Sequence, residues 1–219
     1  MSEFDYVISI GGAAGQGIAT PGNILARLFA RRGIHMYAYN AYQSIIRGGH
    51  SFLTVRCSDR EIRTHGDTID LIICLNQDTM NRHLEHLGPG TSVIFNSDTI
   101  EAGEAADGVQ LCPMPVGELA GKSANRLMQN TVAIAVACQL IGIEFSALED
   151  VLNFQFSSKG EELMAANVEV ARAAYDHSAT NFKPAALQAP QPTTPLAVWA
   201  GNQAFAMAAA GAGVKFYCA

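Results

Sequence analysis

The feature that most constrains the fold is a short apolar segment followed by a glycine-rich stretch near the start of the chain. Residues 5–10, DYVISI, predict a buried strand, and GGAAGQG follows at residues 11–17. Apolar positions at Ile18, Leu25, Leu28 and Phe29 then predict a helix that ends at Gly33. A strand that turns directly into a helix is typical of α/β domains.

The patterns that follow extend this unit. Further strands are expected at residues 35–40, 51–57, 70–75, 91–96 and 109–112, with a helix at 78–86. Helices alone are expected at 125–141, 147–154 and 159–177, the second opened by a capping box of Ser146 and Glu149. We therefore predict a three-layer α/β/α, Rossmann-like domain with C-terminal helices over residues 1–178.

The last part of the chain has a different composition. Residues 179–197 are rich in proline and alanine and lack acidic side chains, which favours an extended linker. Residues 199–213 predict an alanine-rich helix, and residues 214–219 begin like a strand. We expect residues 198–219 to be the truncated start of a second domain.

Composition and charge limit the classes of function. The 219 residues are 49% hydrophobic, with no leader-like start or long apolar run, so a cytoplasmic protein without a membrane span is expected. The net charge of −6 argues against a nucleic-acid partner. Residues 6–58 nevertheless contain no Asp or Glu and five arginines, which favours an anionic small molecule. Alternatively, Arg31 and Arg32 only complement the dipole at a helix end.

The glycine-rich stretch is the first candidate binding site, with Gly12, Gly15, Gln16 and Gly17 as its residues. Backbone N–H groups at a helix start attract phosphate, and glycines permit close approach. However, Thr20 stands where a dinucleotide fingerprint has its third glycine, and residues 37–43 lack the expected acid. An NAD site is therefore disfavoured, whereas a tight turn without a ligand stays open.

The second candidate site is the glycine-flanked arginine at residues 42–50, YQSIIRGGH. Arg47 beside Gly48 and Gly49 offers a forked cation on a close-approach backbone, which suits phosphate or carboxylate. A plain glycine turn with an exposed arginine is the alternative.

No catalytic or metal site is predicted. His83 and His86 share a helix face, but no third ligand accompanies them. The five cysteines are too scattered for a zinc or iron–sulfur site. No nucleophile–base arrangement is apparent.

Three segments together resemble one known family. GGAAGQGI, YQSIIRGGHSFLTVRCSD and NTVAIAVACQLIGI are similar to the gamma domain of 2-oxoacid:ferredoxin oxidoreductases, over about residues 5–178. The segments GNQA at residues 201–204 and FYCA at 216–219 resemble the opening of the alpha domain, which binds the pyrimidine side of thiamine diphosphate. Gln203 departs from that pattern, where a glutamate is expected.

The resemblance implies the gamma/alpha portion of an oxidoreductase that converts a 2-oxoacid, such as 2-oxoglutarate or pyruvate, to acyl-coenzyme A. It implies a partial coenzyme A site, with thiamine diphosphate, Mg and an iron–sulfur cluster only in the complete complex. It also implies a beta subunit, ferredoxin reached through the complex, and an oligomer. Alternatives are a non-catalytic assembly module of that complex or a Rossmann-type NADP-binding domain that uses Arg47. The fragment alone is not expected to be active.

Overall fold

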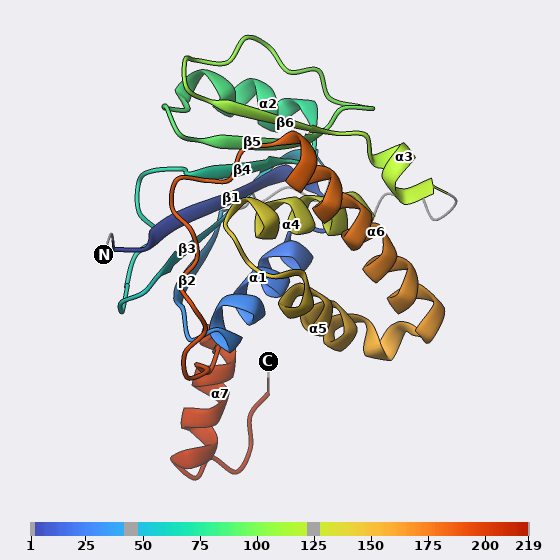
Figure 1. Ribbon diagram of the computed structural model, residues 1–219. Helices are drawn as coiled ribbons and strands as arrows, with labels where there is room; N and C mark the ends of the chain where they lie inside the picture. Colours follow the sequence, from blue (N-terminus) through green and yellow to red (C-terminus); the bar gives the residue numbers. More distant parts are fainter. Residues whose placement is uncertain (1–2, 42–47, 122–127, 219) are drawn as a thin grey trace.

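A six-stranded sheet lies between two layers of helices (Figure 1). The computed structural model describes residues 3–41, 48–121 and 128–218. The elements are, in order, β1 (Asp5–Ala14), α1 (Ala19–Arg31), β2 (His35–Ala41), β3 (Gly48–Ser58), β4 (Leu71–Cys74), α2 (Gln77–His83), η1 (Leu84–His86), β5 (Ser92–Asn96), β6 (Gln110–Met114), α3 (Val116–Ala120), α4 (Met128–Leu140), α5 (Phe145–Phe156), η3 (Ser157–Lys159), α6 (Glu161–Asn181) and α7 (Gly201–Gly211). The predicted α/β class is confirmed.

The strand order is β2-β3-β1-β4-β5-β6. Strand β1 pairs antiparallel with β3 on one side and parallel with β4 on the other, and β4, β5 and β6 continue in parallel. After β1 the chain continues to β2 and β3 on one side of the sheet, whereas after β4 it continues to β5 on the other side. The connections therefore diverge between β1 and β4, and such switch points are where open α/β sheets bind ligands.

The two faces of the sheet bury different cores. Helices α1, α4, α5 and α6 cover one face, and α2 with η1 covers the other (Figure 1). Strands β4 and β5 are buried on both faces, which explains their continuous apolar runs LIIC and SVIFN. Helix α4 is buried almost all round, as expected of a central helix without a polar face.

Strand β1 is longer than the sequence predicts. It continues through Gly11, Gly12 and Ala13 to Ala14, because its antiparallel pairing with β3 extends that far. Opposite Ala14 the register shifts, and Gly49 lies at the irregularity with a φ of +71°. This φ is costly for residues with a Cβ, which favours glycine at this position. The β1–β3 pairing therefore contains a β-bulge at Gly49. The interpretation of residues 11–14 and 48–49 as loop was wrong.

Arg32 connects three segments of the helical layer. Its guanidinium pairs with Glu144 and donates to the carbonyl oxygen of Pro190 at 3.1 Å, although its side chain is only 4% exposed. Helix α5 begins right after Glu144, with no side-chain cap, and the predicted capping box at Ser146 is wrong. The Glu144 carboxylate at this position pairs with Arg32 instead of capping the helix.

The proline-rich segment is extended, as predicted, but it lies along the domain. The N–H groups of Ala185 and Ala189 donate to the end of α4 and the residue after it, and those of Thr193 and Leu196 donate to Arg32 and Ala30. Phe182 and Leu187 pack against the core. No residue of 179–197 is fully buried, but the backbone hydrogen bonds hold this segment as an ordered strap against two helix ends.

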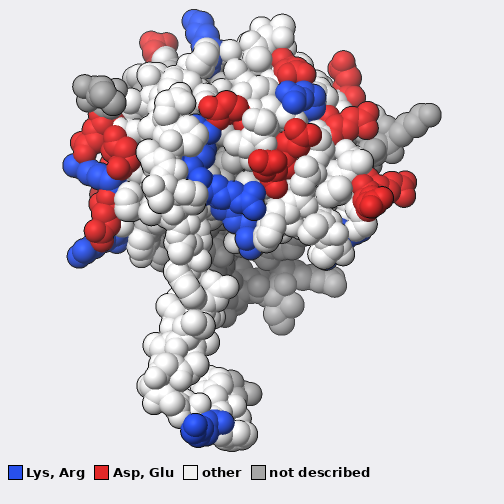
Figure 2. All heavy atoms as spheres, turned by 60° about the horizontal axis from the view of Figure 1, so that its bottom comes forward, with Lys and Arg blue, Asp and Glu red and all other residues white. Residues whose placement is uncertain are grey.

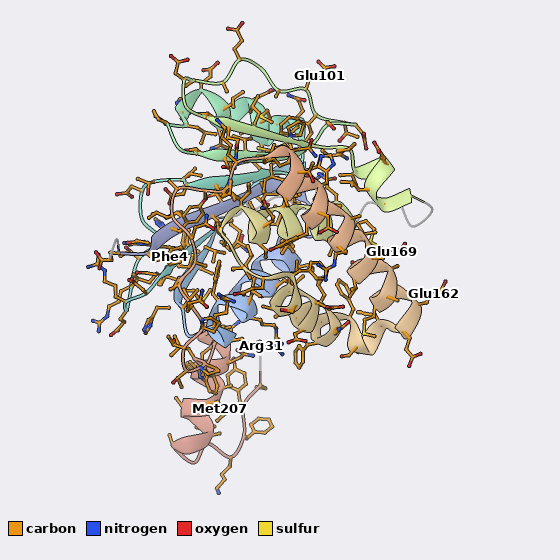
Figure 3. All side chains as sticks on the ribbon, in the orientation of Figure 1. Phe4, Arg31, Glu101, Glu162, Glu169 and Met207 are labelled. Carbon is orange, nitrogen blue, oxygen red and sulfur yellow. The ribbon has the colours of Figure 1, made fainter. Side chains whose placement is uncertain are left out.

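Helix α7 projects from the domain beyond this strap (Figure 1). Its large apolar side chains are exposed, Phe205 by 68% and Met207 by 59%, and Met207 lies far from the sheet in Figure 3. Residues 214–218 form no strand, since no described strand lies beside them. Among the described residues, no helix combines the length and apolar character needed to cross a membrane.

Replacing Glu144 by alanine is expected to leave the buried Arg32 guanidinium without its carboxylate. Breaking a fully buried pair costs roughly 3–5 kcal/mol, and we expect about 1–3 kcal/mol here because half of the Glu144 side chain is exposed. Urea unfolding measures this loss. Asp150→Ala, at an exposed position on the same helix, is the matched control and should change the free energy of unfolding by less than about 0.5 kcal/mol. Equal effects of the two substitutions would contradict this role of Arg32.

Candidate functional site

The loop between β1 and α1 is held in place by the side chain of Gln16. Its Oε1 accepts a hydrogen bond from the N–H of Ala13 at 2.6 Å, and its Nε2 donates to the carbonyl oxygen of Leu75 at 3.0 Å. Leu75 directly follows β4, so one carboxamide joins the ends of two neighbouring parallel strands. Gln16 was predicted as a binding residue, and the structure gives it this positioning contact.

Helix α4 holds the same loop from the other side. Asn130 Nδ2 lies 3.3 Å from the carbonyl oxygen of Gln16 and 3.5 Å from that of Gly17. In a trans peptide the N–H points opposite to the carbonyl, so the N–H groups of Gly17 and Ile18 point away from Asn130. No described residue accepts a hydrogen bond from them or from the N–H of Gly15. These donors at the start of α1 are the kind that bind anions.

Gly17 fits this loop for two reasons. Its φ is +76°, and an added Cβ would lie 3.2 Å from Asn130 Nδ2. A side chain at this position would therefore strain the backbone and press against the residue that holds the carbonyls.

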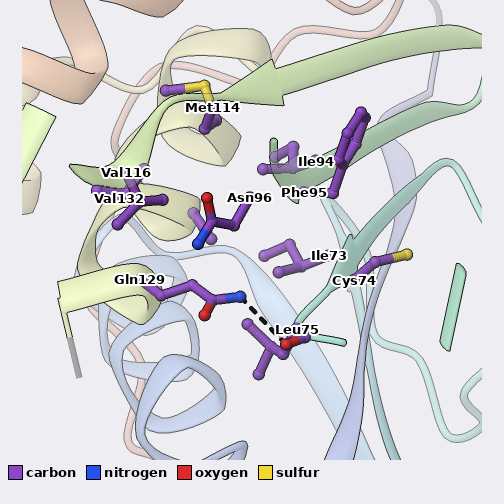
Figure 4. Close-up of a pocket in the computed structure, with 11 residues that line it drawn as sticks. Ile73, Cys74, Leu75, Ile94, Phe95, Asn96, Met114, Val116, Gln129 and Val132 are labelled. Carbon is purple, nitrogen blue, oxygen red and sulfur yellow. Dashed lines mark hydrogen bonds between the residues drawn. The ribbon is translucent and has the colours of Figure 1, made fainter. Parts of the chain in front are cut away.

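A cleft of about 480 Å³ opens beside the loop, across the carboxyl ends of the parallel strands. Its walls combine Gln16 after β1, Asn76 after β4, Asn96 at the end of β5, Gln129 on α4, and the Asp98–Thr99 turn. A smaller apolar cavity of about 10 Å³ lies beneath it and shares Asn96 and Gln129 (Figure 4). Gln129 Nε2 donates to the carbonyl oxygen of Leu75 at 3.2 Å, the dashed contact in Figure 4.

The cleft is rich in carboxamides and has one carboxylate. Asp98 Oδ2 accepts from the N–H of Gly117 at 2.6 Å, and Asn96 Oδ1 accepts from the N–H of Asp98 at 3.0 Å. No lysine or arginine of the described residues lines it. Such walls suit hydroxyl, amide or base groups, whereas the free N–H groups of the loop suit a phosphate.

The sequence-based prediction missed this cleft, although a signal was present. Both central strands are followed by an asparagine and, two residues later, an aspartate: Asn76 with Asp78, and Asn96 with Asp98. Polar residues at adjacent carboxyl ends of parallel strands meet at one edge of the sheet, and that is where ligands bind.

The structure brings most of the predicted site residues together. Gly15, Gln16 and Gly17 form the loop, and Gly48 lies opposite Ala14 at the start of β3. Gly12 is buried within β1, where its position faces Gln16 Oε1 and the Leu75 side chain rather than an open surface. Arg47 lies outside the described residues.

The other arginines of the acid-free segment do not converge on the loop. Arg56 pairs with Asp5 at 2.6 Å, and Arg32 pairs with Glu144. Arg27 and Arg31 lie over the Phe154 ring, in a groove beside the start of α7. Figure 3 labels Arg31 there, and Figure 2 shows basic side chains gathered beside the base of the projecting helix. The expectation that the segment as a whole attracts one anion was therefore wrong for its described arginines.

A histidine pair lies on the opposite face of the sheet from α4. His50 on β3 and His83 on α2 approach to 3.0 Å between their Nε2 atoms. Burial lowers the pKa of both imidazoles, and Arg82 contributes in the same direction. The sequence had grouped His83 with His86 instead, because the partner on β3 is distant along the chain.

Comparisons with known proteins agree with the α/β fold. The family model described as pyruvate ferredoxin/flavodoxin oxidoreductase matches residues 7–177. The ketoisovalerate oxidoreductase subunit VorA of Methanothermobacter thermautotrophicus is 28% identical over 185 residues, which cover 83% of this chain and 38% of that protein. The chain thus spans well under half of this relative.

Two solved structures are similar in fold. The 2-oxoglutarate:ferredoxin oxidoreductase from Magnetococcus marinus, with 2-oxoglutarate, coenzyme A and succinyl-CoA bound, superposes with a TM-score of 0.81 at 26% identity, over 89% of this chain and 34% of that one. The keto/oxoacid ferredoxin oxidoreductase gamma subunit from Geobacter sulfurreducens gives 0.66 at 21% identity, over 80% of this chain and 99% of that one.

Removing the Gln16 carboxamide tests whether it positions the loop. Gln16→Ala is expected to lower the free energy of unfolding by about 1–2 kcal/mol, because the Ala13 N–H loses its acceptor. Gln155→Ala is the matched control, since no hydrogen bond of its side chain is found among the described residues, and a change below about 0.5 kcal/mol is expected. Chemical denaturation of the two variants measures both. A neutral Gln16→Ala would show that the loop is held without it.

Proposed function

Because the chain belongs to the pyruvate ferredoxin/flavodoxin oxidoreductase family, we propose that it forms the coenzyme A-contacting part of a 2-oxoacid:ferredoxin oxidoreductase. The complete enzyme would oxidatively decarboxylate a 2-oxoacid, 2-oxoglutarate or pyruvate, and transfer the acyl group to coenzyme A. The relatives of this chain are subunits of such oxidoreductases, and the Magnetococcus marinus structure contains coenzyme A and succinyl-CoA.

The observation that carries the proposal is the meeting of the glycine loop and the polar cleft at one edge of the sheet. The N–H groups of Gly15, Gly17 and Ile18, for which no acceptor is found among the described residues, would donate hydrogen bonds to a phosphate of coenzyme A. The carboxamides of Asn96 and Gln129 would hydrogen-bond its uncharged groups. Arg47, outside the described residues, remains a predicted further contact.

The oxidative chemistry would be supplied elsewhere in the complex. Cys57, Cys74, Cys112 and Cys138 are buried singly in the core and Cys218 alone is exposed, so the described cysteines do not fit cluster ligation. Thiamine diphosphate, Mg and an iron–sulfur cluster would reside in other parts of the enzyme. What this chain's own residues contribute is the binding and orientation of the acyl acceptor.

The remaining parts of the proposal concern architecture. We assign residues 1–178 to a gamma domain, 179–197 to a linker and 198–219 to the start of an alpha domain. The exposed Trp199, Phe205 and Met207 would then be covered by the rest of that domain. A beta subunit, ferredoxin reached through the complex, an oligomeric state and a cytoplasmic location complete the proposal.

A purely structural role in assembly is the second candidate, and the exposed apolar surface of α7 favours it. An NADP-binding domain is the third. The three are separated by whether the protein binds coenzyme A, NADP or neither.

Filling the cleft tests the proposal. Thr99 is exposed at its rim, so Thr99→Trp should leave the fold intact and raise the Kd for coenzyme A at least about tenfold by excluding the ligand, measured by titration calorimetry. Thr180→Trp, at an exposed position on α6, is the control and should bind like the wild type.

Unchanged affinity in Thr99→Trp would place coenzyme A outside the cleft. Binding of NADP but not of coenzyme A would support an NADP-binding domain, and binding of neither would support the assembly role.

A further inference from the structure

The contact between His50 and His83 joins two elements on the α2 face of the sheet. Their Nε2 atoms are 3.0 Å apart, and the Phe52 ring stacks on His83 with 4.4 Å between centroids. The His50 side chain is only 13% exposed. At this distance the two Nε2 atoms form a hydrogen bond, so one of them carries a proton and the other accepts it. A neutral imidazole allows this, since it has one donor and one acceptor nitrogen.

The outer nitrogen of His50 has no hydrogen-bond partner among the described residues. Nδ1 is buried without a hydrogen bond, and the nearest carboxylate oxygen, Asp78 Oδ2, lies 3.8 Å away. Asp78 also accepts from Arg82 Nε at 2.8 Å, which holds its pKa low and keeps it charged. Histidines that bind metals usually donate their outer N–H to such a carboxylate, which orients the ring.

The spacing of the two Nε2 atoms defines the kind of cation they suit. With metal–nitrogen distances of about 2.0–2.1 Å, nitrogens 3.0 Å apart subtend roughly 90–97° at the metal. This angle fits adjacent positions of a square-planar or octahedral cation, whereas a tetrahedral one needs about 3.3–3.4 Å between them.

We propose that His50 and His83 bind one late first-row divalent cation through their Nε2 atoms, with Asp78 orienting His50 and water completing the coordination. Imidazole nitrogen favours Cu²⁺, Ni²⁺ and Zn²⁺ over Mg²⁺. Within the described ranges, no set of three or more His, Cys, Asp or Glu side chains converges on one point. The site therefore depends on both histidines, and losing either should remove it.

A calorimetric titration with Ni²⁺ near neutral pH tests the pair, in a Cys218→Ser background that removes the exposed thiol. One Ni²⁺ per chain is expected. His50→Gln and His83→Gln should each weaken binding at least about tenfold, and Asp78→Asn should weaken it on the order of tenfold. His86→Gln is the matched control, since His86 lies in η1 and no hydrogen bond or ring contact joins it to His50 or His83 in the described part of the chain, and it should bind like the parent.

Unchanged Ni²⁺ affinity in His50→Gln and His83→Gln would overturn the proposal, as would loss of affinity in His86→Gln. Should a variant fail to fold, the parent protein still decides the matter. Substoichiometric Cu²⁺ should broaden the imidazole NMR signals of His50 and His83 first. Preferential broadening of His35, His65 or His177 would contradict the site.

Discussion

The two hydrogen bonds of the Gln16 carboxamide define the edge of the sheet on which the functional interpretation depends. They link the end of β1 to the residue after β4, across the point where the chain connections diverge. Without them the glycine loop would have no direct side-chain link to the neighbouring parallel strand. With them, Gln16 places the loop at the wall of the cleft formed by the next strand ends. One side chain thus joins the glycine loop, for which we propose phosphate binding, to the cleft that we propose for uncharged groups.

Helix α4 completes this arrangement through two consecutive residues. Gln129 lies on the cleft side and donates to Leu75, whereas Asn130 lies on the loop side and approaches the carbonyls of Gln16 and Gly17. Both are polar residues at the start of a helix that is mostly buried and apolar. Buried polar side chains are retained where their hydrogen bonds specify a structure. Here they fix which way the peptide groups of the loop point.

Much of the fold was predictable because it follows from local patterns. The apolar runs at DYVISI and LIIC and the helix ending at Gly33 were placed correctly, since burial and glycine punctuation are encoded nearby in sequence. The errors have non-local causes. Strand β1 extends to Ala14 because β3 pairs with it, and Glu144, just before α5, pairs with the distant Arg32. Gln16 and its glycines were proposed from the sequence as a binding site, which stays a prediction, and their structural partners Gln129 and Asn130 could not be foreseen because they come from a distant helix.

The central claim is that this edge of the sheet contacts coenzyme A, and amide hydrogen exchange with and without coenzyme A tests it most directly. The account predicts slower exchange at the N–H groups of Gly15, Gly17 and Ile18, because the ligand would accept their hydrogen bonds. Exchange should also slow in the turn at Asp98 and Thr99, because the ligand would cover it. Exchange in α7 should not change. Protection confined to α7, or no protection at saturating coenzyme A, would contradict the account.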